Sequence, residues 1–96
     1  MDAPFRVLVT PRFERELRKL LRHHPDLASV YQEALALLAA DPHNRAGRRW
    51  MKKLAGVKPG EGQYRLRLER WRFRYDIFER DVVLHYCGLR REDTYK

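Results

Sequence analysis

The 96-residue sequence predicts an α+β fold, in which a two-helix hairpin packs on one face of a small antiparallel-meander sheet. Two observations predict it. Apolar residues recur at helical spacing between residues 11 and 40, and they alternate with polar residues in three segments between 64 and 88. The expected order is β-α-α-β-β-β in a single domain over residues 1–96, because no repeat or linker interrupts the pattern.

The first half of the chain predicts one strand and two helices. Residues 5–10 are rich in β-branched residues and read as a strand, and Thr10 is expected to cap the helix that follows. That helix ends before Pro25, because the residue before a proline is pushed out of helical geometry. Asp26 is expected to cap a second helix, which runs to a break at residues 41–44.

The second half predicts a meander of three strands, and the first strand is expected to join the same sheet. Residues 45–54 are ambiguous between a short helix and a basic loop. Strands are expected at residues 64–68, 71–78 and 82–88, with turns at residues 69–70 and 80–81.

In the first two strands of this meander, large apolar residues alternate with arginines. Side chains alternate between the two faces of a strand, so one face is apolar and the other carries arginine. With the turn at 69–70, Arg67 lies opposite Arg72 and Arg65 lies opposite Arg74. Like charges in such positions destabilise a sheet by about 0.2–1 kcal/mol per pair. We therefore expect an anion on this face, since arginine binds phosphate oxygens bidentately.

The same pairing, carried across the turn at 80–81, gives the register of the last strand. Asp76 and Glu69 are the acids that would neutralise the arginines if their face were only solvated. His85 is expected to make a structural hydrogen bond, and Cys87 is expected to be an inert thiol. The expected pairs are Asp76 with His85 and Arg74 with Cys87 on the arginine face, and Tyr75 with Tyr86 on the apolar face.

The formal net charge of +8 favours a polyanionic partner, although a basic and inert surface is the plainer alternative. Between residues 45 and 74 the only acids are Glu61 and Glu69, among many lysines and arginines. Lys52 and Lys53 lie in this basic region and are expected to contact the same polyanion.

Other classes of protein are disfavoured by what the sequence lacks. Cys87 is the single cysteine, which fits a reducing compartment without a disulfide framework. No signal-peptide pattern is present, and no stretch approaches the roughly 20 apolar residues of a membrane helix. We therefore expect a cytoplasmic protein with no membrane partner. No metal motif or carboxylate cluster is visible, so no metal cofactor is expected.

Taken in order, several short segments make the chain similar to the RelE/ParE toxin superfamily of bacterial type II toxin–antitoxin systems. The similarity spans nearly the whole chain, and the β-α-α-β-β-β order of that family agrees with the order expected above. The segments are Val9-Thr10-Pro11-Arg12-Phe13 with Leu17, Leu20 and Leu21; Lys53-Leu54-Ala55-Gly56; Tyr64-Arg65-Leu66-Arg67; Trp71-Arg72-Phe73-Arg74-Tyr75; and Gly88-Leu89-Arg90 with Tyr95.

The resemblance to RelE-like members implies an mRNA interferase, a metal-independent endoribonuclease that inhibits translation and needs no cofactor. Such enzymes usually cut mRNA in the ribosomal A site. The 2′-hydroxyl attacks the adjacent phosphate, which gives a 2′,3′-cyclic phosphate and a 5′-hydroxyl, and basic residues stabilise the charge that develops. The resemblance also implies a cognate antitoxin protein as partner, beside the mRNA and the ribosome.

Carried over by position, the resemblance implies a set of catalytic residues. RelE enzymes often have lysine where Arg65 and Arg67 stand, and arginine is a poor general base. Proton transfer would then fall to Tyr95 or His85. The implied catalytic residues are Arg65, Arg67, Arg72, Arg90 and Tyr95, and the expected RNA-binding residues are Arg74, His85, Lys52 and Lys53.

Two other functions stay open at the level of the sequence. A ParE-like inhibitor of DNA gyrase would have the same fold without nuclease chemistry, and a nucleic-acid-binding module would lack catalysis altogether. Within the resemblance, the segment Gly88-Leu89-Arg90 and Tyr95 favour the nuclease.

Overall fold

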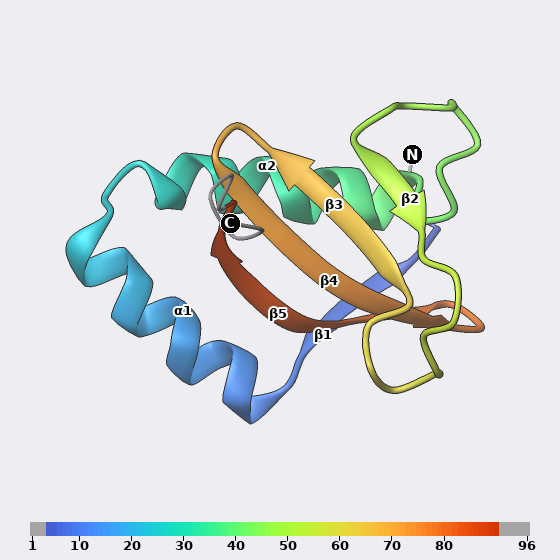
Figure 1. The fold of residues 1–96 in the computed structure, drawn as a ribbon, viewed down its shortest axis with the longest axis horizontal. Helices are drawn as coiled ribbons and strands as arrows, with labels where there is room; N and C mark the ends of the chain where they lie inside the picture. Colours follow the sequence, from blue (N-terminus) through green and yellow to red (C-terminus); the bar gives the residue numbers. More distant parts are fainter. Residues whose placement is uncertain (1–3, 91–96) are drawn as a thin grey trace.

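The computed structural model describes residues 4–90 and contains one five-stranded sheet with two helices (Figure 1). The strands lie in the order β1-β5-β4-β3-β2, with β1 parallel to β5 and every other pair antiparallel. The predicted α+β class is thus confirmed. The elements are β1 (Arg6–Val9), α1 (Pro11–His23), α2 (Leu27–Ala40), β2 (Met51–Lys53), β3 (Tyr64–Leu68), β4 (Trp71–Phe78) and β5 (Asp81–Leu89).

The hydrophobic core lies between the two helices and one face of the sheet. The central strand β4 contributes Trp71, Phe73 and Tyr75, all fully buried. Phe13 of α1 and Leu27 of α2 pack against the same cluster. In Figure 1, α2 runs behind the strands and α1 lies beside the β1–β5 side of the sheet. The opposite face of the sheet is left without a helix.

The predicted start of α1 is confirmed. Thr10 has an extended backbone, and its hydroxyl accepts a hydrogen bond of 3.0 Å from the backbone N–H of Phe13. Pro11 follows at the first helical position, where its missing N–H costs nothing.

The prediction that Asp26 caps α2 is wrong. Its carboxylate makes no capping bond, and instead accepts hydrogen bonds from Arg70 Nε at 3.1 Å and Nη2 at 2.8 Å. The same carboxylate accepts the indole N–H of Trp71 at 3.0 Å. A buried indole needs a partner for its N–H, and Asp26 supplies it from the surface. The α1–α2 turn is thereby tied to the β3–β4 turn.

The segment between α2 and β3 resolves the ambiguity of residues 45–54. Asp41 organises its first turn by accepting the backbone N–H groups of Arg45 and Ala46 at 2.8 and 3.1 Å. The chain then forms the short strand β2, neither helix nor simple loop. Burial decides this, because Met51 is only 3% exposed and pairs with the fully buried Leu66.

The expected register between β4 and β5 is wrong, both in the position of the turn and in the residues that pair. The turn falls at residues 79–80, so Tyr75 pairs with Leu84, and a β-bulge at His85 then interrupts the ladder. Beyond the bulge Arg74 pairs with Tyr86 and Phe73 with Cys87. One extra residue reverses the alternation of faces. Tyr86 therefore leaves the core for the arginine face, and Cys87 enters the core.

Among residues 4–90, neither helix is long and apolar enough to cross a bilayer.

The Asp26 contacts predict a stability that depends on acid. Hydrogen bonds from Arg70 and then Trp71 lower the pKa of Asp26 from 3.8 to about 2. A lowered folded-state pKa contributes stability above the unfolded value, and this is lost as pH falls through the folded value. The melting-temperature difference between the native chain and Asp26→Asn should therefore shrink between pH 4 and pH 2. Glu33→Gln, which removes a helix-surface carboxylate, should show no such trend; a constant Asp26→Asn difference across this range would contradict the assignment.

Candidate functional site

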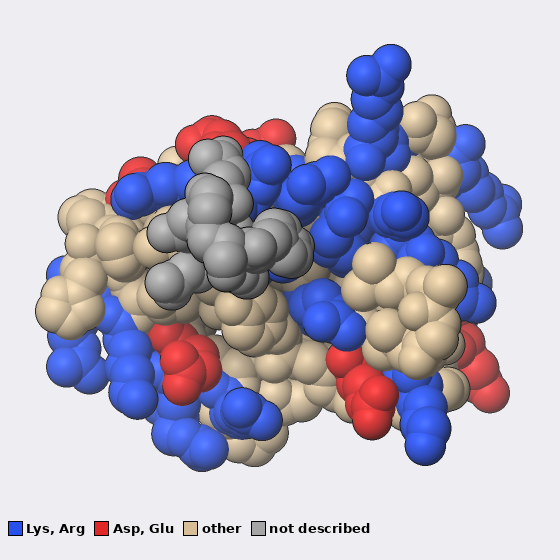
Figure 2. Space-filling model, viewed as in Figure 1, with Lys and Arg blue, Asp and Glu red and all other residues tan. Residues whose placement is uncertain are grey.

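Four arginines gather on the open face of the sheet, and they are called the arginine cluster below. The predicted cross-strand pairs Arg67–Arg72 and Arg65–Arg74 are confirmed. Burial lowers the pKa of the Arg65 guanidinium, and the positive charges of Arg67, Arg72 and Arg90 lower it further. Figure 2 shows lysines and arginines massed over β2 and β3 on this face. The arginine cluster consists of Arg65, Arg67, Arg72 and Arg90.

No acid neutralises the arginine cluster within residues 4–90. None of its members forms an ion pair there, and the buried Nε atoms of Arg65 and Arg72 have no hydrogen-bond partner. A buried donor without an acceptor costs about 1–3 kcal/mol. The cluster is therefore short of acceptors and of negative charge, and both would be supplied by an anion.

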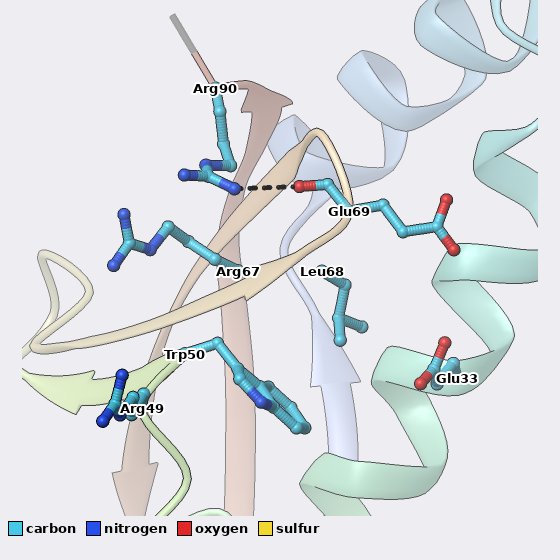
Figure 3. A pocket seen from close by; sticks show the side chains of 7 residues that line it. All are labelled: Glu33, Arg49, Trp50, Arg67, Leu68, Glu69 and Arg90. Carbon is cyan, nitrogen blue, oxygen red and sulfur yellow. Dashed lines mark hydrogen bonds between the residues drawn. The ribbon is translucent and has the colours of Figure 1, made fainter. Parts of the chain in front are cut away.

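Arg90 joins the cluster from the end of β5. Its backbone N–H donates to the carbonyl of Arg70 at 2.7 Å, and its Nη1 donates to the carbonyl of Glu69 at 3.1 Å. The Glu69 carboxylate points away from Arg67 and Arg90 (Figure 3). The main chain of the β3–β4 turn thus positions Arg90 without cancelling its charge.

A hollow of about 460 Å³ adjoins the cluster at the β2–β3 edge (Figure 3). Trp50 and Leu68 form its apolar part, and Arg49, Arg67 and Arg90 point to one side of it. The carboxylates of Glu33 and Glu69 lie on the opposite side. A cavity with an aromatic wall and a cationic side has the size and chemistry to accept part of a nucleotide.

Arg74 lies on the same face as the arginine cluster but differs from it in its hydrogen bonds. Its Nε donates to the carbonyl of Gly62 at 2.9 Å, and its Nη2 donates to that of Glu61 at 3.2 Å. Gly62 has a φ of +82°, and a Cβ there would lie 2.9 Å from the Cβ of Arg74. The close approach requires glycine. Arg74, expected to bind RNA, therefore holds the loop before β3.

Asp76 fastens the same loop from beneath. Its fully buried carboxylate accepts the backbone N–H groups of Gly60, Gly62 and Gln63 at 3.0, 2.8 and 3.0 Å. The Nε2 atom of His85 lies 2.9 Å from Asp76 Oδ2. The expected proximity of Asp76 and His85 is confirmed, although the bulge brings it about and Asp76 itself pairs with Val83.

The two lysines of β2, both expected to bind RNA, lie on opposite faces of the edge strand. Lys52 pairs with Arg65, and both Lys52 and Lys53 are exposed. Lys53 places its Nζ 5.7 Å from the ring centre of Tyr64. Lys52 therefore continues the basic surface of the arginine cluster, whereas Lys53 has the same parity as the buried Met51 and lies on the helix-side face at the sheet edge.

Three further residues complete the comparison with the sequence. Tyr95 lies outside the described residues. Cys87 is only 4% exposed, and burial raises the pKa of its thiol to about 12, which agrees with the expected buried or inert thiol. Tyr86 was expected in the core, yet it lies exposed beside the arginines. Regular alternation along β5 predicts the wrong face for Tyr86. The nearest sign of a bulge in the sequence is Gly88, because a glycine inside a strand often marks a bulge.

Within residues 4–90, no three His, Cys, Asp or Glu side chains are grouped as a metal site would require. Comparisons with protein-family models, with curated proteins and with solved structures find no match to this chain.

The geometry predicts opposite effects for two neighbouring arginines. Arg65→Met should stabilise the free protein by about 0.2–1 kcal/mol, because it removes a partly desolvated charge repelled by three others. Arg74→Met should destabilise it, because two loop carbonyls lose their donor. Urea unfolding at low salt measures both. Equal destabilisation by the two substitutions would show that the cluster is not repulsive.

Asp76 predicts a second stability change. Asp76→Asn leaves one acceptor oxygen where the carboxylate has two, so at least one of three backbone N–H groups loses its acceptor, at about 1–3 kcal/mol for each donor left buried. The variant should unfold at lower urea, with faster hydrogen exchange at one or more of Gly60, Gly62 and Gln63. Glu79→Gln, at the exposed β4–β5 turn, is the matched control. Unchanged exchange at all three residues would contradict the role given to Asp76.

Proposed function

We propose that this chain is the toxin of a type II toxin–antitoxin system and acts as a metal-independent endoribonuclease that cleaves mRNA and inhibits translation. The observation that carries the proposal is the arginine cluster, which is partly buried and has no acidic partner among residues 4–90. The ligand proposed for the arginine cluster is a phosphate of single-stranded RNA. The resemblance of the sequence to RelE-like toxins supplies the reaction.

In this reaction the 2′-oxygen forms a bond to phosphorus and the bond from phosphorus to the 5′-oxygen breaks. The products are a 2′,3′-cyclic phosphate and a 5′-hydroxyl. Negative charge builds up on the phosphate oxygens, and Arg65, Arg67 and Arg72 stabilise it from the sheet face. Their mutual repulsion in the free protein favours the bound anion, since neutralisation relieves it.

Two protons move in the same reaction. The 2′-hydroxyl loses one, and the leaving 5′-oxygen gains one. Arginine stays protonated at neutral pH and performs neither transfer. The Nε2 atom of His85 lies 2.9 Å from the buried carboxylate of Asp76, at the loop end of the sheet and outside the arginine cluster. We therefore assign proton transfer to Tyr95, by the resemblance, with the ribosome supplying the alignment of the RNA.

The cognate antitoxin is proposed to bind as an acidic segment over the arginine cluster. It would offset part of the +8 charge and occupy the phosphate site at once. Such a partner would neutralise the arginine cluster in the complex and leave it open to RNA in the free toxin.

Expression of the free chain should arrest growth and cut translated mRNA, with cut sites read by primer extension. Arg72→Ala should lower the cleavage rate by about 10²–10³-fold, because it removes one charged contact to the transition state. Its melting temperature should stay at or above that of the native chain. Arg22→Ala on the exposed end of α1 removes the same charge from a residue outside the cluster and should cleave normally.

Two outcomes would overturn the nuclease. Intact transcripts together with blocked DNA supercoiling would identify a gyrase inhibitor. Intact transcripts, normal supercoiling and Arg72-dependent RNA binding would identify a nucleic-acid-binding module.

A further inference from the structure

Tyr86 is an exposed aromatic residue on the same face as the arginine cluster. It retains 48% of its accessible surface, and its strand partner is Arg74. The β-bulge at His85 turns it to this face, while Leu84 and Cys87 on either side of the bulge remain in the core. Bulges commonly re-aim side chains beside functional sites.

Gly88 makes the room in which the Tyr86 ring lies. Gly88 is buried in the interior of β5 and pairs with Arg72. A Cβ at this position would overlap the Tyr86 hydroxyl and come within 2.7 Å of its Cζ. Glycine weakens a strand interior and often marks a close approach by another group. The hydroxyl end of the ring therefore lies over Gly88, next to Arg72 of the cluster.

Tyr86 also borders a second hollow, of about 670 Å³. Arg74, His85 and Arg12 line this hollow together with Tyr86. No hydrogen bond within residues 4–90 engages the Tyr86 hydroxyl. The ring thus stands between the phosphate site proposed for the arginine cluster and an open space large enough for a nucleobase.

We propose that Tyr86 is a nucleobase-binding platform, on which the base next to the cluster-bound phosphate stacks inside this second hollow. The proposal rests on single-stranded RNA as the ligand of the proposed function. Single-stranded nucleic acids are held by cationic side chains on their phosphates and by aromatic rings on their bases. The structure places both kinds of side chain on adjacent strands, with Arg72 opposite Gly88 and Arg74 opposite Tyr86.

The test measures binding without cleavage. Fluorescence anisotropy with a labelled 2′-O-methyl oligoribonucleotide, which lacks the attacking hydroxyl, compares Tyr86→Ala and Tyr86→Phe with the native chain. Tyr86→Ala should weaken binding by about 5- to 150-fold, the equivalent of one stacked base, and Tyr86→Phe should bind nearly as the native chain does. Phe78→Ala is the matched control, because Phe78 is similarly exposed at 46% but lies at the other end of β4.

A second arm identifies the stacked base. Abasic residues are introduced one at a time along the oligonucleotide, and Tyr86→Ala should lose its effect on the oligonucleotide that lacks the stacked base. Gly88→Ala should weaken binding of the intact oligonucleotide, because it displaces the ring. Circular dichroism and melting temperature confirm that each variant is folded.

The outcomes separate this inference from the proposed function. Equal effects of Tyr86→Ala on intact and on every abasic oligonucleotide would overturn the platform. Arg72-dependent binding with no effect of Tyr86→Ala would also overturn it, while leaving the proposed function in place. If binding depends on Tyr86 but the native chain does not cleave unmodified RNA, the result would support the platform and overturn the nuclease. An oligonucleotide that binds no more tightly to the native chain than to Arg72→Ala would overturn both.

Discussion

Burial of three aromatic side chains along the central strand is the interaction on which the rest of the structure depends. Trp71, Phe73 and Tyr75 are fully buried and occupy successive inward positions of β4. Because strand side chains alternate between faces, their burial leaves Arg72 and Arg74 no choice but the opposite face. The core and the basic surface are therefore two consequences of one pattern.

Three aspartates among residues 4–90 serve as acceptors for loops and turns, away from the arginine cluster. Asp26 binds Arg70 and Trp71 across two turns, Asp41 organises the turn after α2, and Asp76 holds three backbone N–H groups before β3. Each has its oxygens committed away from the cluster. The same carboxylates that stabilise the fold are thus unavailable to neutralise the surface proposed to bind RNA.

Arginines on the same face have different roles. Within residues 4–90 the side chains of Arg65, Arg67 and Arg72 have no hydrogen-bond acceptor and Arg90 has one carbonyl, whereas Arg74 donates to two loop carbonyls. A cationic face of this kind is less stable than a neutral one, and the cost is recovered when an anion binds. Selection for such a surface is easier to explain by a bound polyanion than by the stability of the sheet.

The sequence by itself determined the α+β class, the first helix cap and the pairing of β3 with β4, since apolar periodicity and a short turn leave few alternatives. The sequence did not predict strand β2, because a strand of three residues forms only through its pairing with β3 and the burial of Met51. The faces of Tyr86 and Cys87 were decided only by the tertiary structure. A single bulged residue at His85 reverses the alternation beyond it, and a bulge leaves no periodic signal in the sequence because one extra residue is set by how the strand packs and pairs.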